Sequence, residues 1–191
     1  VLTDKNRTTI VAYPAGKGKR YIIPDGITKI GTHSFFACYP ITYIHIPNSV
    51  KTIELFAFAS CTDLDTVILG NSVDSIEVAA FRINDRLKTI YSMNPIPPAA
   101  HTGAFDSFNS FFIQCTLHVP AGSLQAYKNA EVWKNFKNIV ENDFTGIERS
   151  TPNKAKIFGN KNSIAFRNIE PGTDISIYDT TGKCIKTFAM D

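Results

Sequence analysis

Residues 46–68 read IPNSVKTIELFAFASCTDLDTVI, and this stretch decides the fold because its neighbours on both sides repeat it. Residues 23–45 read IPDGITKIGTHSFFACYPITYIH, and residues 69–91 read LGNSVDSIEVAAFRINDRLKTIY. A fixed period of this length means that equivalent side chains recur in successive copies. We therefore expect a stack of similar coils, each of which is too small to fold alone.

Aligning the three copies places apolar side chains in five columns. Aliphatic columns at a period of about 20 to 29 residues predict a leucine-rich repeat solenoid, rich in short strands with turns and 3-10 segments between them. The five columns are Ile27, Val50 and Val73; Ile30, Ile53 and Ile76; Phe35, Phe58 and Phe81; Ile41, Leu64 and Leu87; and Ile44, Val67 and Ile90.

The repeat extends beyond the three complete copies in both directions. Residues 8–24 fit an incomplete first coil with a turn at Pro14–Gly18, and Phe105 to Pro120 fit a last coil with extra residues inserted. The insertion begins NPIPP, and because proline lacks the backbone N–H, we expect a loop bulging from this coil. The pattern therefore predicts about four coils, which together with the closing segment form a first domain over residues 1–143.

A closing segment is expected over residues 121–143. Apolar side chains recur there at short, helix-like spacings, which predicts one or two amphipathic helices, with Ser123 as a possible N-cap. A solenoid needs such a cap because its last coil otherwise exposes its core to water. Trp133 is expected in this core. The recurring residues are Leu124, Tyr127, Val132, Trp133, Phe136 and Val140.

The C-terminal part of the chain has a different pattern. Residues 144–156 are polar, contain Gly146 and Pro152, and predict a linker. Residues 157–191 alternate apolar and polar side chains between turn signals, which predicts a small all-β module. We expect this module to be truncated or weakly ordered because its strands make only half of a small sandwich.

Composition excludes several classes of protein. The chain has 191 residues, 43% of them hydrophobic, and a net charge of +3. Residues 1–148 carry 13 basic and 13 acidic side chains, which argues against a nucleic-acid partner because no dense basic face is available. No stretch is apolar enough for a membrane helix. The start has neither Met nor a signal-peptide pattern, so we expect that a preceding segment has been removed.

One face of the predicted strands is the candidate binding surface. In TYIHIP, Ile44 and Ile46 point inward, so Tyr43 and His45 point outward. The period extends these positions into two outward rows about 20 Å long, which mix aromatic, imidazole and aliphatic groups as protein-binding surfaces do. The alternative is a plain β surface of residues with high strand propensity. The rows are Arg20, Tyr43, Thr66, Thr89 and Thr116, and Ile22, His45, Ile68, Tyr91 and His118.

The sequence offers little for catalysis or metal binding. His45 and His118 share a row but lie three coils apart, too far to bind one ion. No serine elbow, H-E-x-x-H or P-loop motif occurs. We therefore predict no enzyme activity, no metal and no cofactor. The remaining enzymatic alternative is a hydrolase that uses the 95–103 loop and its His101.

Cys38 and Cys61 occupy the same slot in successive coils. Their Cα atoms are expected about 5 Å apart, within the range of a disulfide. Asn84 takes this slot in the next coil, which favours a small buried residue whose side chain bonds to turn backbone groups. Free buried thiols are the preferred interpretation, and the redox state stays open.

The unit IPNSVKTIELFAFASCTDLDTVI resembles the BspA-type leucine-rich repeat of bacterial surface antigens. The ending LHVPAGSLQAYKNAEVWKNFKNIVE is similar to the terminal cap of many such proteins, so the resemblance covers about residues 8–142. It departs from the repeat at Gly70, where the family has Pro, at Asn84, where it has Cys, and at Arg82 and Ile83, where it has small residues.

The ISIYDTTGKCIK stretch near the C-terminus resembles a type IX secretion sorting domain, although the closing strands of that family are missing. These resemblances imply an exported bacterial protein, on the cell surface or extracellular, that adheres to host extracellular proteins or other cells. The function hypothesis is protein binding through the outward rows. The alternative is a structural spacer whose activity lies in other segments. The oligomeric state and the ligand stay open.

Overall fold

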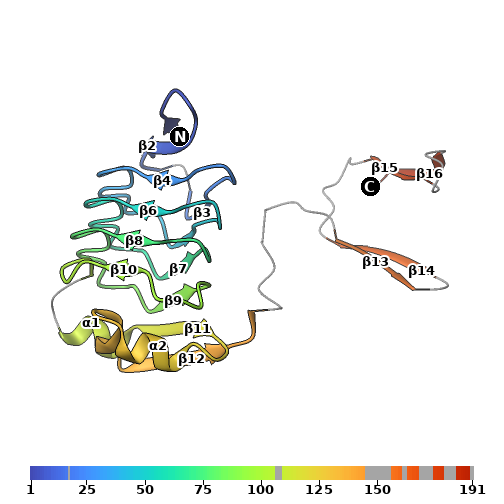
Figure 1. Ribbon diagram of the computed structural model, residues 1–191. Helices are drawn as coiled ribbons and strands as arrows, with labels where there is room; N and C mark the ends of the chain where they lie inside the picture. Colours follow the sequence, from blue (N-terminus) through green and yellow to red (C-terminus); the bar gives the residue numbers. More distant parts are fainter. Residues whose placement is uncertain are drawn as a thin grey trace. The chain divides into compact units, whose positions relative to one another are not determined.

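The computed structural model describes residues 1–16, 18–105 and 109–144, together with four strands between residues 156 and 189. It divides into two compact units, Val1–Phe144 and Thr145–Asp191, which are described separately. The first unit is a stack of coils that runs from the N-terminus to a closing layer (Figure 1). No helix in the described ranges is long and apolar enough to cross a bilayer.

Each successive coil contributes one strand to each of two sheets, which face each other across the core (Figure 1). Apart from the antiparallel pair β1–β2, neighbouring strands in sheet A are parallel. Sheet A consists, in spatial order, of β1 (Leu2–Thr3), β2 (Thr9–Ala12), β4 (Lys29–Ile30), β6 (Thr52–Ile53), β8 (Ser75–Ile76) and β10 (Ala99–Ala100).

Sheet B is parallel throughout the described residues. Its six strands make the solenoid longer than the expected four coils, because five coils contribute one strand each and the closing segment adds β12. The spatial order is β3 (Arg20–Ile22), β5 (Tyr43–His45), β7 (Thr66–Leu69), β9 (Thr89–Ser92), β11 (Thr116–Pro120) and β12 (Asn138–Asn142).

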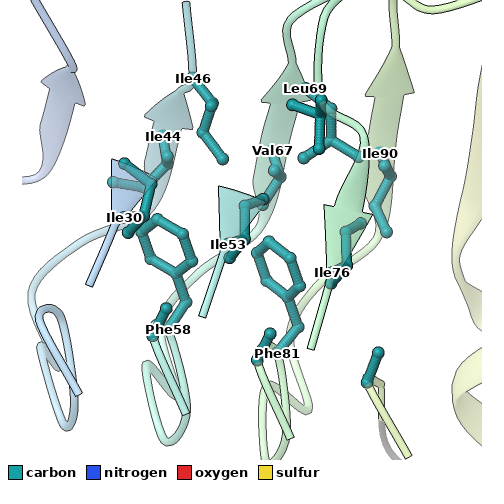
Figure 2. Close-up of a cluster of buried hydrophobic side chains, with 14 of the residues drawn as sticks. Ile30, Ile44, Ile46, Ile53, Phe58, Val67, Leu69, Ile76, Phe81 and Ile90 are labelled. Carbon is teal, nitrogen blue, oxygen red and sulfur yellow. The ribbon is translucent and has the colours of Figure 1, made fainter. Parts of the chain in front are cut away.

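All five predicted columns lie in the core, where no member exceeds 5% exposure. Figure 2 shows equivalent side chains of successive coils in rows, with Phe58 and Phe81 oriented alike. The aromatic column is a continuous stack with centroid separations of 4.8 to 5.6 Å. Coils therefore stabilise each other through the same contacts repeated along the axis. The stack runs Tyr13, Phe35, Phe58, Phe81, Phe105 and Phe111.

The side chains at the position shared by Cys38, Cys61 and Asn84 donate hydrogen bonds to turn carbonyls, as the sequence indicates. The Cys61 thiol donates to the Phe35 carbonyl at 3.0 Å, and the Asn84 amide donates to the Phe58 carbonyl at 3.0 Å. The Cys38 thiol lies 3.9 Å from the Tyr13 carbonyl. Cys38 and Cys61 are therefore free buried thiols in this structure, which agrees with the preferred interpretation. Burial raises the pKa of Cys61 to about 12.

Two departures from the repeat have structural consequences: close packing explains Gly70, and Ile83 carries backbone strain. Gly70 lies against the preceding coil, where a Cβ would lie 2.4 Å from the Pro47 carbonyl oxygen, so no larger residue fits. Ile83 has a φ of 58°, and the equivalent residues Ala37 and Ser60 share this left-handed conformation. A β-branched residue rarely adopts it, so Ile83 is strained where a small residue is not.

The closing segment is only partly helical. It contains α2 (Leu124–Asn129) and the 3-10 helix η1 (Trp133–Asn135). A further helix, α1 (Asn109–Gln114), which the sequence did not reveal, precedes it in the last coil. The helical prediction for Val140 is wrong, because residues 138–142 form strand β12 and pair with β11. Backbone pairing to the preceding strand overrides the apolar spacing there. Ser123 precedes α2, but its side chain makes no cap hydrogen bond.

Aromatic side chains attach the closing segment to the NPIPP loop. The Tyr127 hydroxyl donates to the Asn94 carbonyl at 2.7 Å and lies 2.7 Å from the Ser92 hydroxyl. The Trp133 indole N–H donates to the Pro98 carbonyl at 2.7 Å. Trp133 and Tyr127 are fully buried, so Trp133 belongs to the core as predicted.

The second unit is described only as strands. β13 (Lys156–Asn160) pairs with β14 (Ser163–Arg167), and β15 (Asp174–Tyr178) pairs with β16 (Cys184–Ala189), both antiparallel. Most of the predicted linker, residues 145–155, lies outside the described residues. The resemblance of this unit to a sorting domain stays a prediction.

Candidate functional site

The two outward rows of sheet B lie in the register that the period predicts. Arg20 pairs with Tyr43, Tyr43 with Thr66, and Thr66 with Thr89. Thr116 follows Thr89 on the next strand. The second row is brought together in the same way. It contains Ile22, His45, Ile68, Tyr91 and His118. We call these ten residues the strip.

Most of the strip is accessible, with one exception. Arg20 is exposed and eight other members are partly exposed. Ile68, which we expected to be available for contact, is only 6% exposed. It lies in its row between His45 and Tyr91 on the neighbouring strands. Ile68 therefore offers a partner little accessible surface, unlike the other members of the strip.

The N-terminal end of the strip carries a cation fixed on an aromatic ring. The Arg20 guanidinium carbon lies 3.7 Å from the centroid of the Tyr43 ring. Such an arrangement holds the flat guanidinium group in one orientation and leaves its N–H edges available for acceptors. This end therefore presents directional hydrogen-bond donors and a positive charge.

The other end of the strip is an aromatic cluster. The Tyr91 and His118 rings stack at 4.6 Å, and the Phe144 ring meets Tyr91 edge-on at 6.4 Å. His118 Nδ1 lies 2.6 Å from the Asn142 side-chain amide nitrogen, which donates to it. Burial lowers the pKa of His118, which favours the neutral form of its ring.

Strand β12 lengthens this face beyond the residues that the sequence indicated. Asn138 pairs with Thr116, and Val140, which is 44% exposed, pairs with His118. The sequence offered one signal, since Ile139 pairs with Leu117 and follows it at a separation close to the repeat period. The helical spacing of the surrounding apolar residues concealed it.

His33, His45 and His118 lie apart from one another. His33 is in an exposed turn, where its ring stacks on Phe56 at 5.1 Å. His45 and His118 are on β5 and β11, with β7 and β9 between them. In the described residues no group of three potential metal ligands is close enough to hold an ion.

His101 lies beside a shallow groove on sheet A together with Ser75 and Glu77. The Gly103 N–H donates to His101 Nδ1 at 3.1 Å, so the neutral ring carries its proton on Nε2. The Ser75 hydroxyl donates to the Thr52 hydroxyl at 3.4 Å. Neither interaction joins the Ser75 hydroxyl to the His101 ring as a nucleophile is joined to its base.

Solved structures with a similar fold include bacterial repeat proteins. The pneumococcal vaccine antigen PcpA is 16% identical with a TM-score of 0.45, and the match covers 73% of this chain and 45% of that protein. The leucine-rich repeat protein TpLRR from T. pallidum is 18% identical with a TM-score of 0.44, and the match covers 65% of this chain and 70% of that protein.

A leucine-rich cell surface protein from Faecalibacterium prausnitzii is 18% identical with a TM-score of 0.36. This match covers 71% of the present chain and 35% of that protein, so the chain spans less than half of two of these three structures. A search of curated proteins finds no significant match.

The decisive comparison is with a family of repeats. Six copies of the BspA-type leucine-rich repeat region match residues 14–118, which is more than half of the chain. The matched range covers the strands from β3 to β10 and the first part of β11. The protein therefore belongs to the BspA-type leucine-rich repeat family.

Proposed function

We propose that this chain is an exported bacterial surface module that binds another protein through the strip, without catalysis. The observation that supports it is the continuity of the strip. Equivalent positions on five adjacent strands form two uninterrupted rows on one face of sheet B. A repeated face of this kind is the extended surface with which solenoid proteins bind their partners.

The two ends of the strip suit it to a protein partner. Arg20 and Tyr43 combine charge, hydrogen bonding and aromatic area, as do the residue types that dominate binding energy at interfaces. Tyr91 and His118 are fixed by stacking, which reduces the entropy that they lose on binding. The threonines between them are small and polar, and leave room for a partner to approach the sheet.

The test is binding of the purified chain to a panel of host extracellular-matrix and plasma proteins. The variant combines Tyr43→Glu with Tyr91→Glu and is first checked for an unchanged thermal midpoint. We expect saturable binding by the natural chain and at least about a 100-fold loss in the variant, because one aromatic anchor is removed at each end of the strip.

A matched control combines Phe36→Glu with Tyr39→Glu. These residues are 49% and 56% exposed and lie outside the strip. Equal loss in both variants, or no loss in the strip variant, contradicts the proposal. Absence of binding to every panel member favours the spacer alternative.

A further inference from the structure

The two sheets end differently at the closing segment. Sheet B continues through β11 to β12, whereas β10 is the last strand of sheet A (Figure 1). Among the described strands, β10 therefore has a neighbour on one side only, which is β8. An edge strand of this kind offers backbone groups to another extended chain.

The backbone of Ala100 faces this open edge. The Ala99 N–H donates to the Asp74 carbonyl and the His101 N–H to the Ile76 carbonyl, both at 2.9 Å, so these residues face β8. Because backbone groups alternate sides along a strand, the N–H and C=O of Ala100 point the other way.

The equivalent carbonyls of earlier coils show what is missing. Each of them accepts an N–H from the next coil at 2.9 Å, whereas no described residue supplies a donor to the Ala100 carbonyl. The satisfied pairs are the Ile10 carbonyl with Gly31, the Ile30 carbonyl with Glu54, the Ile53 carbonyl with Glu77, and the Ile76 carbonyl with His101.

The closing segment forms a hydrogen bond to the chain two residues before this position. The Trp133 indole satisfies the Pro98 carbonyl, just before Ala99 in the chain. Ala100 occupies the inward row of Ile30, Ile53 and Ile76, which are at most 1% exposed, yet its own side chain remains partly exposed. At Ala100, therefore, both the core-facing side chain and the outward backbone groups are incompletely covered.

A groove beside the edge adds a chemical preference. It has a volume of about 410 Å³ and is lined by Ser75, Glu77, Ala99, Ala100 and His101. The small side chains of Ala99 and Ala100 leave it open. Glu54, in the same row as Glu77, is paired with Lys29 at 3.0 Å, whereas no described residue provides a cation for Glu77.

We propose that the open edge of β10 is a second binding site, which takes an extended peptide carrying a lysine or arginine. The peptide adds a strand to sheet A, exchanging backbone hydrogen bonds with Ala100, and its cationic side chain lies across Ala99 toward Glu77. Strand addition to an exposed edge is a common mode of peptide recognition, in which the main chain gives affinity and side-chain pockets give specificity. This site is separate from the strip.

The test uses the full 191-residue chain and two fluorescein-labelled peptides, Thr-Val-Lys-Val-Thr-Val and its counterpart with Glu for Lys. Fluorescence polarisation measures their affinities. Ala100→Pro removes the outward N–H but no bond to β8, and proline is tolerated on an edge strand, so the fold is expected to survive. We expect this variant to bind the lysine peptide about tenfold more weakly.

Glu77→Gln provides a second variant of conservative shape, and is expected to abolish the preference for the lysine peptide while leaving the glutamate peptide unchanged or slightly tighter. The strip variant Tyr43→Glu with Tyr91→Glu should bind both peptides as the natural chain does, which separates this site from the proposed function. The proposal is overturned if the natural chain binds neither peptide, or if Ala100→Pro binds the lysine peptide normally. It is equally overturned if the edge instead pairs two copies of the chain, seen as a dimer that Ala100→Pro converts to monomer.

Discussion

The regular coils, residues 23–92, and the closing segment, residues 121–143, are stabilised in different ways. In the coils each residue meets its own equivalent in the next coil, as Phe58 meets Phe35 and Phe81. In the closing segment unlike elements meet, as Tyr127 bonds to Ser92 and Trp133 to Pro98. In a repeat the same packing contacts recur between every pair of coils, whereas a cap depends on a few contacts that occur once.

The largest expected effect is in the coils. Phe58→Ala should lower the free energy of unfolding by about 3 to 5 kcal/mol, because Phe58 is fully buried and stacked on both sides. Urea denaturation measures this loss. Phe36→Ala is the control, since Phe36 is 49% exposed and follows Phe35 of the same column. A loss below about 1 kcal/mol for Phe58→Ala contradicts the role of the stack.

A smaller effect is expected in the cap. Tyr127→Phe leaves the Asn94 carbonyl and Ser92 hydroxyl without their partner and should cost about 1 to 2 kcal/mol. Hydrogen exchange should show the loss mainly in residues 109–144. Tyr39→Phe, at a residue that is 56% exposed, should change nothing. Equal loss of protection in coils and cap would remove the distinction between the two regions.

The same variant should alter the pH dependence of stability. Burial raises the pKa of Tyr127 to about 12 from its ordinary value of 10.0. The unfolded chain therefore ionises first, and this residue makes stability fall as the pH rises from 10.0 to about 12. Tyr127→Phe should show a shallower alkaline decline, measured by urea denaturation at each pH.

The smallest expected effect is a gain at the last regular coil. Ile83→Gly should raise the free energy of unfolding by about 1 kcal/mol, because glycine adopts a φ of 58° without strain. Ile96→Gly is the matched control, at an isoleucine that is 73% exposed and lacks a positive φ. Thermal unfolding compares the two. A gain in both variants would show that removing exposed apolar surface, and not backbone strain, is responsible.

The sequence was sufficient wherever the period holds. It predicted all five core columns and the register of the strip, because the equivalent residue of the next copy is necessarily the neighbour in the next coil. It failed where partners occur once. Val140 has helical spacing from Phe136, but β11 provides a strand to pair with, and this tertiary pairing decides its conformation.

Side-chain size limited the prediction of the candidate site. Alternation gives the direction of Ile68 but not its accessibility, which depends on the packing of side chains around it and is only 6%. Likewise, Phe144 was expected in a linker, yet its ring meets Tyr91. The open edge at Ala100 also depends on where the cap stops, which no local pattern reports.

The coil-to-coil hydrogen bonds also determine how the first unit responds to mechanical load. They run along the axis of the stack, from the Phe35 amide to the Ala57 carbonyl and from the Phe58 amide to the Ala80 carbonyl. Tension between Val1 and Phe144 is carried by these interfaces in series, so the weakest interface yields first, and each coil that yields releases about 75 Å of extended chain. Under a pull along its axis, the unit would lengthen in steps of one coil, and each step would limit the force transmitted between its two ends.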